Sequence, residues 1–306
     1  MYSKNKYVKK DNPYFNKKIE AYRSAIKKHI RIIIEKECPP YFRNELKYAL
    51  RGGHKWRPIL LLAIAEMLNK RPLRVIDTAC AMEFIHCASL ILDDLPSMDN
   101  AKRRRGAASF HKKFGIAQAE IVSHILVALS YRLLLNNSLA LKDKKCNTIK
   151  LATDTLFNIS IGQSYDLEYT GKKINLRKVK LISKYKSGIF YSKVCAASAI
   201  LLDRSEKEKD ALLKFGKNLG MAYTVFDDLF DIQGKPSKGG KEINKDKNKT
   251  TFPRLLGIRR AQMELENYKN KAIKCLGIFK NRGFVSYITE KILFLDKVIK
   301  IKERCQ

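Results

Sequence analysis

Two clusters of aspartate residues are the part of this sequence best suited to chemistry. The first occupies positions 93–99 with the sequence DDLPSMD, and the second occupies positions 227–231 with the sequence DDLFD. Each cluster follows a run of apolar residues, where an unpaired carboxylate is costly to desolvate. Carboxylate oxygens are ligands that Mg²⁺ prefers in proteins, usually together with substrate phosphates. The two clusters therefore predict a site for a magnesium-bound diphosphate.

The spacing within each cluster predicts how its carboxylates are presented. Asp227 and Asp231 are four residues apart, which places them on one face of a helix. Asp93 and Asp99 are six residues apart, and Pro96 between them disfavours a regular helix. We therefore expect the chain to turn after Asp93 and to bring Asp99 back toward it. The predicted metal ligands are Asp93, Asp94, Asp99, Asp227, Asp228 and Asp231.

Helices are expected to position these clusters. Apolar residues recur at helical spacing over 21–34, 56–68, 74–92, 117–135, 148–168 and 206–232, and no segment has the alternation of a strand. Turn-forming and polar residues predict loops at 69–73, 95–106, 136–147, 170–177 and 233–250, with a break at 281–283. No Pro-, Gly- or Ser-rich linker divides the 306 residues. The sequence predicts one all-α domain over 1–306, with a basic segment at 1–15 whose order is left open.

The net charge of +32 makes nucleic acid an obvious candidate partner. The lysines, however, are spread through nearly every segment and are not interleaved with aromatic residues as in nucleic-acid-binding surfaces. A proteome-wide lysine bias is an alternative explanation. We therefore expect no specific nucleic acid, although the charge should attract anionic diphosphates and could promote loose contact with acidic membranes or RNA.

Several features predict a soluble protein of a reducing compartment, most simply the cytoplasm. Charged residues such as Glu66, Asp77 and Glu83 interrupt each apolar run, so no transmembrane segment is expected. The lysine-rich N-terminal segment lacks the apolar core of a secretory signal. The seven cysteines are scattered and lack paired metal-ligand spacing, which predicts free thiols and no zinc site.

Other short motifs accompany the aspartate clusters in a fixed order. They are GGHKWRP at 52–58, Glu83 to His86, Ser89, Arg104-Arg105-Gly106, Phe114-Gly115, Gly162-Gln163 with Asp166, Lys186-Ser187-Gly188, Gly240-Lys241, Lys245-Asp246 and KTTFP at 249–253. This order resembles that of the trans-isoprenyl diphosphate synthases (the polyprenyl synthetase family), and in particular farnesyl and geranylgeranyl diphosphate synthases. The match runs from Gly52 to Pro253.

The resemblance implies a fold and an activity. The fold would be a helical bundle of the isoprenoid synthase type around a deep central apolar cavity, assembled as a homodimer. The activity would be that of a prenyltransferase with about three Mg²⁺ ions per active site. It would condense isopentenyl diphosphate with an allylic diphosphate, namely dimethylallyl, geranyl or farnesyl diphosphate. Because a carbocation forms as diphosphate leaves, cations must neutralise the leaving group, and no nucleophilic side chain is required.

The resemblance also assigns roles to individual residues. The allylic diphosphate and the carbocation would be held by Arg104, Lys186, Ser187, Lys241 and Lys249. The substrates, isopentenyl diphosphate above all, would further contact Arg57, His86, Arg105, His54, Tyr223 and Thr224. The position of His86, seven residues before Asp93, supports its role because two helical turns place both on one face.

The sequence departs from the family pattern at several positions. His54 stands where lysine is usual, and Tyr223-Thr224 stands where a phenylalanine-glutamine pair is usual. Ala107-Ala108 likewise replaces Lys-Pro. Because histidine is only partly charged near neutral pH, we expect weaker binding of isopentenyl diphosphate.

A noncatalytic partner subunit is therefore a rival interpretation, although such a subunit need not keep both aspartate clusters. A terpene cyclase is disfavoured because its second metal motif is normally of an Asn/Ser/Glu type.

Product length is predicted from the residues that precede the first cluster. The position five residues before Asp93 is Ala88, where a bulky aromatic residue is associated with farnesyl diphosphate in enzymes that resemble this chain. Ala88 leaves room for a longer chain, so geranylgeranyl diphosphate is the expected main product. Farnesyl diphosphate is the alternative, if Phe84 or a partner-subunit residue fills the space.

Overall fold

The structure, a computed structural model, describes residues 12–137, 142–232 and 248–293. Its α-helices are α1 (Pro13–Glu37), α2 (Arg43–Ala49), α3 (Trp56–Met67), α4 (Ile76–Asp93), α5 (Phe110–Phe114), α6 (Ile116–Leu135), α7 (Lys142–Tyr169), α8 (Leu176–Ser183), α9 (Ile189–Leu201), α10 (Glu206–Ile232), α11 (Phe252–Leu256), α12 (Ile258–Cys275) and α13 (Gly283–Ile292). Short 3-10 turns are η1 (Pro40–Phe42), η2 (Pro72–Val75) and η5 (Leu276–Ile278), and η3 (Lys184–Gly188) is a π-helix.

The predicted all-α fold is confirmed. The expectation of no strand is wrong in one place, because β1 (Arg103–Arg104) and β2 (Ala107–Ala108) form a short antiparallel hairpin.

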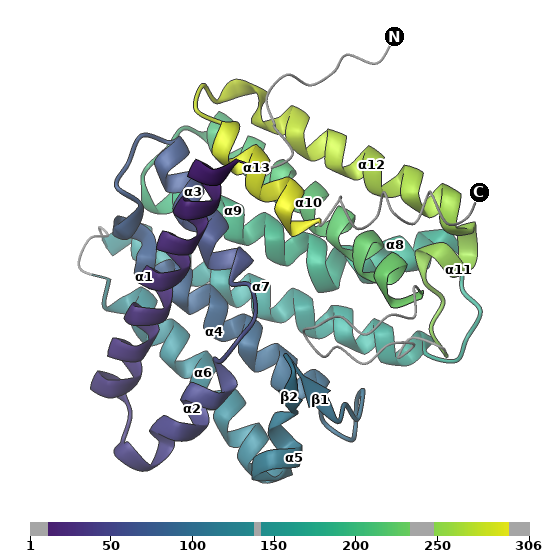
Figure 1. Ribbon diagram of the computed structural model, residues 1–306, viewed down its shortest axis with the longest axis horizontal. Coiled ribbons are helices and arrows are strands. Elements are labelled where there is room, and N and C mark those ends of the chain that lie inside the picture. Colours follow the sequence, from purple (N-terminus) through teal and green to yellow (C-terminus); the bar gives the residue numbers. More distant parts are fainter. Residues whose placement is uncertain (1–11, 138–141, 233–247, 294–306) are drawn as a thin grey trace.

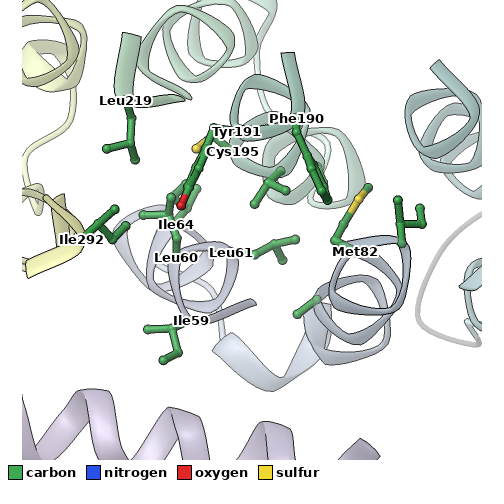
Figure 2. Close-up of a cluster of buried hydrophobic side chains, with 14 of the residues drawn as sticks. Ile59, Leu60, Leu61, Ile64, Met82, Phe190, Tyr191, Cys195, Leu219 and Ile292 are labelled. Atoms are coloured by element: carbon green, nitrogen blue, oxygen red, sulfur yellow. The ribbon is translucent and has the colours of Figure 1, made fainter. Parts of the chain in front are cut away.

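The bundle is built around helices that are buried on most sides (Figure 1). Nine of the 12 residues of α3 are buried, as are 11 of 18 in α4 and nine of 13 in α9. In Figure 2, Leu61 of α3 points toward Met82 of α4, Ile64 lies beside Tyr191 of α9, and Ile59 lies on the opposite side of α3. Burial of this apolar surface is the main favourable term in folding. The core therefore fixes α3, α4 and α9 relative to one another.

The outer helices follow the amphipathic pattern. In α1, at the left edge of Figure 1, Ile19, Ile26, Ile30 and Ile33 recur at helical spacing and are buried, while lysines cover the opposite face. The helix begins with Asn12, whose side chain accepts a hydrogen bond from the Phe15 backbone N–H at 3.1 Å. The expected basic N-terminus thus becomes helical from Pro13 onward.

Glycines allow three segments to pack with unusually close backbones. A Cβ added to Gly216 of α10 would lie 2.3 Å from the Tyr191 carbonyl oxygen of α9. A Cβ on Gly220 would lie 2.5 Å from the Ser187 carbonyl oxygen of η3. On the other side of η3, a Cβ on Gly162 of α7 would lie 2.8 Å from the Lys186 backbone nitrogen. The π-helix η3 is therefore held between α7 and α10 by glycines.

The predicted element boundaries agree with the structure for the strongly periodic helices. The ranges 21–34, 56–68, 117–135 and 206–232 fall on α1, α3, α6 and α10. The loop expected at 136–147 is wrong from Lys142 onward, because α7 begins there in a segment with few apolar residues. Helix α9 falls outside the predicted ranges because burial on most sides leaves little periodicity to detect.

Two segments, Pro72–Asp93 and Ile116–Leu135, are long and apolar enough to cross a membrane by length and composition. Their apolar windows are 67% and 39% buried inside the protein, and α4 packs closely against α6. The core helices of soluble proteins have the same length and composition. The six cysteines in the described part of the chain are free thiols, as the sequence predicts.

Replacing Gly216 with alanine should destabilise the protein by about 1–3 kcal/mol, because the added methyl group cannot fit against the Tyr191 carbonyl without moving α9. Chemical denaturation followed by circular dichroism measures the change. The matched control is Gly283→Ala at the start of α13, where an added Cβ meets no atom within 4 Å. Equal stability of the two variants would contradict the close packing of α9 on α10.

Candidate active site

The first aspartate cluster lies where α4 ends. The backbone N–H of Asp99 donates to the carbonyl oxygen of Asp93 at 3.0 Å, and Ala101 donates to Asp94 at 3.1 Å. The chain therefore turns after Asp93 and brings Asp99 back, as Pro96 predicts. Burial raises the pKa of Asp93, and the charge of Lys186 acts in the opposite direction. A cation near Asp93 would thus favour its ionised form.

Asp94 is buried and is neutralised by an arginine of the hairpin. The Nε of Arg104 lies 3.0 Å from both carboxylate oxygens of Asp94, and its Nη2 lies 2.5 Å from Oδ1. Such a forked pair is among the stronger hydrogen-bonded ion pairs in proteins. Arg104 is thereby fixed beside the first aspartate cluster, and its contact with the allylic diphosphate stays a prediction.

Asp166 of α7, which lies outside both clusters, joins two of the predicted lysines. Its Oδ2 lies 2.7 Å from the Nζ of Lys186 and 2.8 Å from the Nζ of Lys249. Lys249 also reaches Oδ1 of Asp99 at 3.3 Å. Burial alone would raise the pKa of Asp166, but the two ammonium charges outweigh it and lower the pKa. The bridging role of Asp166 was missed by sequence reasoning, although the residue belongs to one of the quoted motifs.

The π-helix η3 carries Lys186 and Ser187 to this site. Single π-helical turns occur frequently at functional sites, since they redirect side chains within a continuous helix. Here η3 separates α8 from α9 and is fixed between Gly162 and Gly220. The position of Lys186 therefore depends on the packing of α7 and α10 as well as on its ion pair with Asp166.

The second aspartate cluster ends α10. Asp231 is buried, and Oδ2 of Asp228 accepts a hydrogen bond from the Phe252 backbone N–H of α11 at 3.1 Å. One turn earlier, the rings of Tyr223 and Tyr191 are tilted at 46° with centroids 5.7 Å apart. Burial together with the charge of Asp227 raises the pKa of Tyr223 to about 12. Thr224 donates to the Gly220 carbonyl oxygen within α10 at 3.2 Å. Lys241 lies outside the described residues.

Arg57 and His86, two predicted contacts for isopentenyl diphosphate, lie together. Nη1 of Arg57 is 3.1 Å from Nε2 of His86, so the imidazole accepts the hydrogen bond in its neutral form. The Arg57 guanidinium also lies 4.8 Å and 4.6 Å from the ring centroids of Phe190 and Tyr191. These contacts from α3, α4 and α9 orient Arg57.

A buried carboxylate, Glu83, connects this pair to the hairpin. Oε1 of Glu83 lies 2.9 Å from Nζ of Lys55 and 3.6 Å from Nη2 of Arg105. Burial alone would raise the pKa of Glu83, but Lys55 and Arg105 outweigh it and lower the pKa. Lys55 was not predicted as a site residue. Its signal in the sequence is its position in the Gly52–Pro58 motif, 28 residues before Glu83.

His54 is not brought together with these residues. Its side chain is exposed and stacks on Trp56 with a centroid distance of 5.8 Å, while its carbonyl oxygen accepts a hydrogen bond from Nε of Arg23. The next side chain, that of Lys55, points inward instead, and the Lys55 backbone is in the left-handed region at φ 56°. Contact between His54 and substrate stays a prediction.

The aspartate oxygens suit Mg²⁺ by their chemistry. Among the residues that the structure describes, no three His, Cys, Asp or Glu side chains gather closely enough to hold a metal ion by themselves. Two of the aspartates predicted as metal ligands are instead paired with cationic side chains, Asp94 with Arg104 and Asp99 with Lys249. This arrangement fits a metal that takes several of its oxygen ligands from a substrate diphosphate.

The sequence profile of the family described as polyprenyl synthetase matches residues 39–282 of this chain. The chain belongs to the polyprenyl synthetase family. Farnesyl diphosphate synthase of Geobacillus stearothermophilus is 31% identical over 259 residues, which cover 82% of this chain and 86% of that enzyme. Geranylgeranyl pyrophosphate synthase 4 of Arabidopsis thaliana is 31% identical over 295 residues, covering 94% and 77% of the two chains. The crystal structure of the geranyltransferase from Legionella pneumophila superposes with a TM-score of 0.82 at 25% identity and covers 93% of this chain and 98% of that one.

Membership of the polyprenyl synthetase family confirms the resemblance drawn from the ordered motifs. The match includes both aspartate clusters, the hairpin and η3, which lie within residues 39–282. The relatives include both farnesyl and geranylgeranyl diphosphate synthases, so the comparison leaves product length open.

His86 should make the stability of the protein depend on pH. Burial lowers the pKa of His86 well below 6.5, and the charges of Arg57, Arg105 and Lys55 lower it further. Because the folded pKa is below the unfolded value, stability is fully present above about pH 6.5 and falls as the pH is lowered. Between pH 6.5 and 5.5 the wild type should lose about 1 kcal/mol more than His86→Gln does.

Urea denaturation at several pH values measures this difference. His124→Gln is the matched control, because it removes an exposed histidine of α6. If His86→Gln has the same pH dependence as the wild type, His86 is not held neutral in the folded protein.

Proposed function

We propose that this protein is a magnesium-dependent short-chain trans-prenyltransferase that condenses isopentenyl diphosphate with an allylic diphosphate. The observation that carries the proposal is that two adjacent arginines pair with different carboxylates. Arg104 pairs with Asp94 beside the metal-ligand cluster, whereas Arg105 pairs with Glu83 beside Arg57 and His86. Two neighbouring anion sites are what a condensation of two diphosphates requires.

The allylic substrate would occupy the side of the aspartate clusters. Asp93, Asp99, Asp227 and Asp231 would supply metal ligands, and a bound metal would neutralise charge on the diphosphate. Arg104, Lys186 and Lys249, with Lys241 of the undescribed segment, would hold the diphosphate oxygens. Because negative charge on the diphosphate grows as its carbon–oxygen bond breaks, these cations stabilise the transition state more than the ground state.

Isopentenyl diphosphate would occupy the other side without a metal. Arg57 and Arg105 would hold its diphosphate, and the neutral His86 would orient Arg57. Tyr223 and Thr224 would contact the substrates from α10, and Ser187 and Lys186 would stabilise the carbocation with their oxygen atoms. The double bond of isopentenyl diphosphate attacks the allylic carbon, and the released diphosphate takes the proton that the product loses. No protein nucleophile takes part.

We further propose that the protein is a cytoplasmic homodimer of single-domain subunits. Exposed apolar side chains on α6 and α7 support the homodimer. Ile121 and Leu135 of α6 are 46% and 55% exposed, and Phe157 of α7 is 67% exposed. Packing of this face against a second copy would remove large apolar side chains from water.

Geranylgeranyl diphosphate is the proposed main product, with farnesyl diphosphate as the alternative. Ala88 is buried in α4 on the side of α6, since its carbonyl oxygen lies 3.5 Å from the Ser123 hydroxyl. Phe84, one turn earlier, is also fully buried. The apolar cavity that would take the growing chain beneath the first cluster stays a prediction, and its floor would be set by these two residues.

Labelled isopentenyl diphosphate, Mg²⁺ and each allylic primer in turn would test the function, with chromatography of the products. Chain elongation in any of these reactions supports the proposal and identifies primer and product together. Binding of substrates without elongation would favour the second candidate, a noncatalytic partner subunit, for which the replacement of lysine by His54 is the supporting feature.

Removal of one carboxylate from either cluster should abolish most activity. Asp93→Ala and Asp227→Ala each remove an expected metal ligand and should lower turnover by about 3–6 kcal/mol in barrier terms while the fold is retained. The matched control is Asp210→Ala on α10, which removes an exposed carboxylate paired with Lys214. Near-normal turnover in either cluster variant would show that the metal ligands are assigned wrongly.

Enlarging Ala88 should shorten the product. Ala88→Tyr adds an aromatic ring beneath the first cluster and should shift the main product from geranylgeranyl to farnesyl diphosphate. Product chromatography measures the change, and circular dichroism checks that the buried substitution is tolerated. A wild type that already stops at farnesyl diphosphate, or an unchanged product in a folded variant, would place the floor elsewhere.

A further inference from the structure

The hairpin that presents Arg104 and Arg105 has a strained turn. Its strands pair Arg103 with Ala108 and Arg104 with Ala107, so Arg105 and Gly106 form a two-residue connection. Both have positive φ, 52° for Arg105 and 81° for Gly106. The first position of such a turn favours Gly, Asn or Asp, and a long side chain there persists only where its surroundings hold it.

The end of α2 holds this hairpin from outside. The hydroxyl of Tyr48 donates to the Ala108 carbonyl oxygen at 2.7 Å. Nη2 of Arg51 donates to the same oxygen at 3.0 Å and to the Arg104 carbonyl oxygen at 3.3 Å. Arg51 therefore bridges the two strands at their backbone.

Arg51 also fixes the side chain of Arg105. The Arg51 carbonyl oxygen accepts a hydrogen bond from Nη1 of Arg105 at 3.2 Å. Gly53 lies flat against the same guanidinium, because an added Cβ there would be 2.8 Å from its Cζ atom. The Arg105 guanidinium is thus enclosed by the segment 51–53 on one side and by Glu83 of α4 on the other.

Arg51 itself is fixed by local contacts and not by a counterion. Its guanidinium lies 3.4 Å from the Tyr48 ring centroid, and its Nη1 donates to the Tyr48 carbonyl oxygen at 2.6 Å. In the part of the chain that the structure describes, no carboxylate lies within salt-bridge distance of Arg51. Burial lowers the pKa of Arg51, and the charge of Arg105 lowers it further. An uncompensated arginine beside two others adds positive potential where an anion is expected to bind.

We propose that Arg51, braced by Tyr48, is a positioning residue that sets Arg105 for the diphosphate of isopentenyl diphosphate. The inference rests on the proposed function. Arg51 acts on Arg105 twice, through the backbone of the hairpin and through its own carbonyl oxygen, and without it the strained Arg105 conformation is held by fewer contacts. Its hydrogen bond to Arg104 is to the backbone carbonyl oxygen, whereas the Arg104 side chain is held by Asp94, so loss of Arg51 should affect isopentenyl diphosphate more than the allylic substrate.

Isothermal titration of isopentenyl diphosphate without metal, together with steady-state kinetics, tests the proposal. Arg51→Ala should weaken binding of isopentenyl diphosphate and raise its KM by roughly 10- to 100-fold, because misplaced cations lose orientation. The KM of the allylic substrate and kcat at saturation should change less than about threefold. Tyr48→Phe, which removes only one hydrogen bond to the hairpin, should give a smaller change in the same direction.

Arg43→Ala is the matched control. Arg43 begins α2, the helix that ends just before Arg51. It also binds only carbonyl oxygens, those of Cys38 at 3.0 Å and Glu35 at 2.8 Å, but it does not reach the hairpin. Its loss should lower thermal stability as much as the loss of Arg51 without changing the KM of isopentenyl diphosphate.

The outcomes separate the inference from the function on which it rests. If the wild type elongates primers and Arg51→Ala binds isopentenyl diphosphate normally, or Arg43→Ala weakens binding equally, the positioning role is wrong and the function stands. If the wild type neither binds isopentenyl diphosphate nor elongates any primer, both are wrong. Should Arg51→Ala fail to fold, Tyr48→Phe decides, and unchanged binding in it overturns the role.

Discussion

The ion pair between Lys55 and Glu83 is the interaction on which the arrangement of the site depends. The two side chains are 1% and 2% exposed, and Nζ of Lys55 lies 2.9 Å from Oε1 of Glu83. Loss of one partner from such a buried pair leaves an uncompensated charge and typically costs about 3–5 kcal/mol. The pair joins the start of α3 to the middle of α4. It thereby sets where Arg57, two residues after Lys55, meets His86, three residues after Glu83.

Three carboxylates of the site are balanced by neighbouring cations. Glu83 is surrounded by Lys55 and Arg105, Asp94 by Arg104, and Asp166 by two lysines. In each case the carboxylate fixes a cation that the proposed mechanism needs. This arrangement places the cations before substrate binds, so less orientation has to be gained at the moment of reaction.

Local sequence patterns predicted many of the helices and the turn at the first aspartate cluster. Helical periodicity located α1, α3, α6 and α10, and Pro96 predicted the turn that returns Asp99 to Asp93. These features depend on residues that are close in sequence, which is why they could be inferred without coordinates.

The contacts that could not be predicted join distant segments. Lys55 and Glu83 are 28 residues apart, and Arg51 meets Ala108 across 57 residues. The left-handed backbone at Lys55 and Arg105 could not be predicted from the sequence either, because neither residue type favours positive φ. Such conformations follow from the surrounding packing and not from local propensity.

The Gly52–Pro58 motif illustrates how one unusual backbone angle redirects its side chains. Because Lys55 has φ 56°, its ammonium group points into the core, while His54 beside it remains exposed against Trp56. The motif therefore still supplies a cation to the site, and that cation is bound to Glu83. The histidine at position 54 leaves this buried ion pair intact. Any weakening of substrate binding by His54 would therefore arise from the His54 side chain itself and not from loss of the Lys55–Glu83 pair.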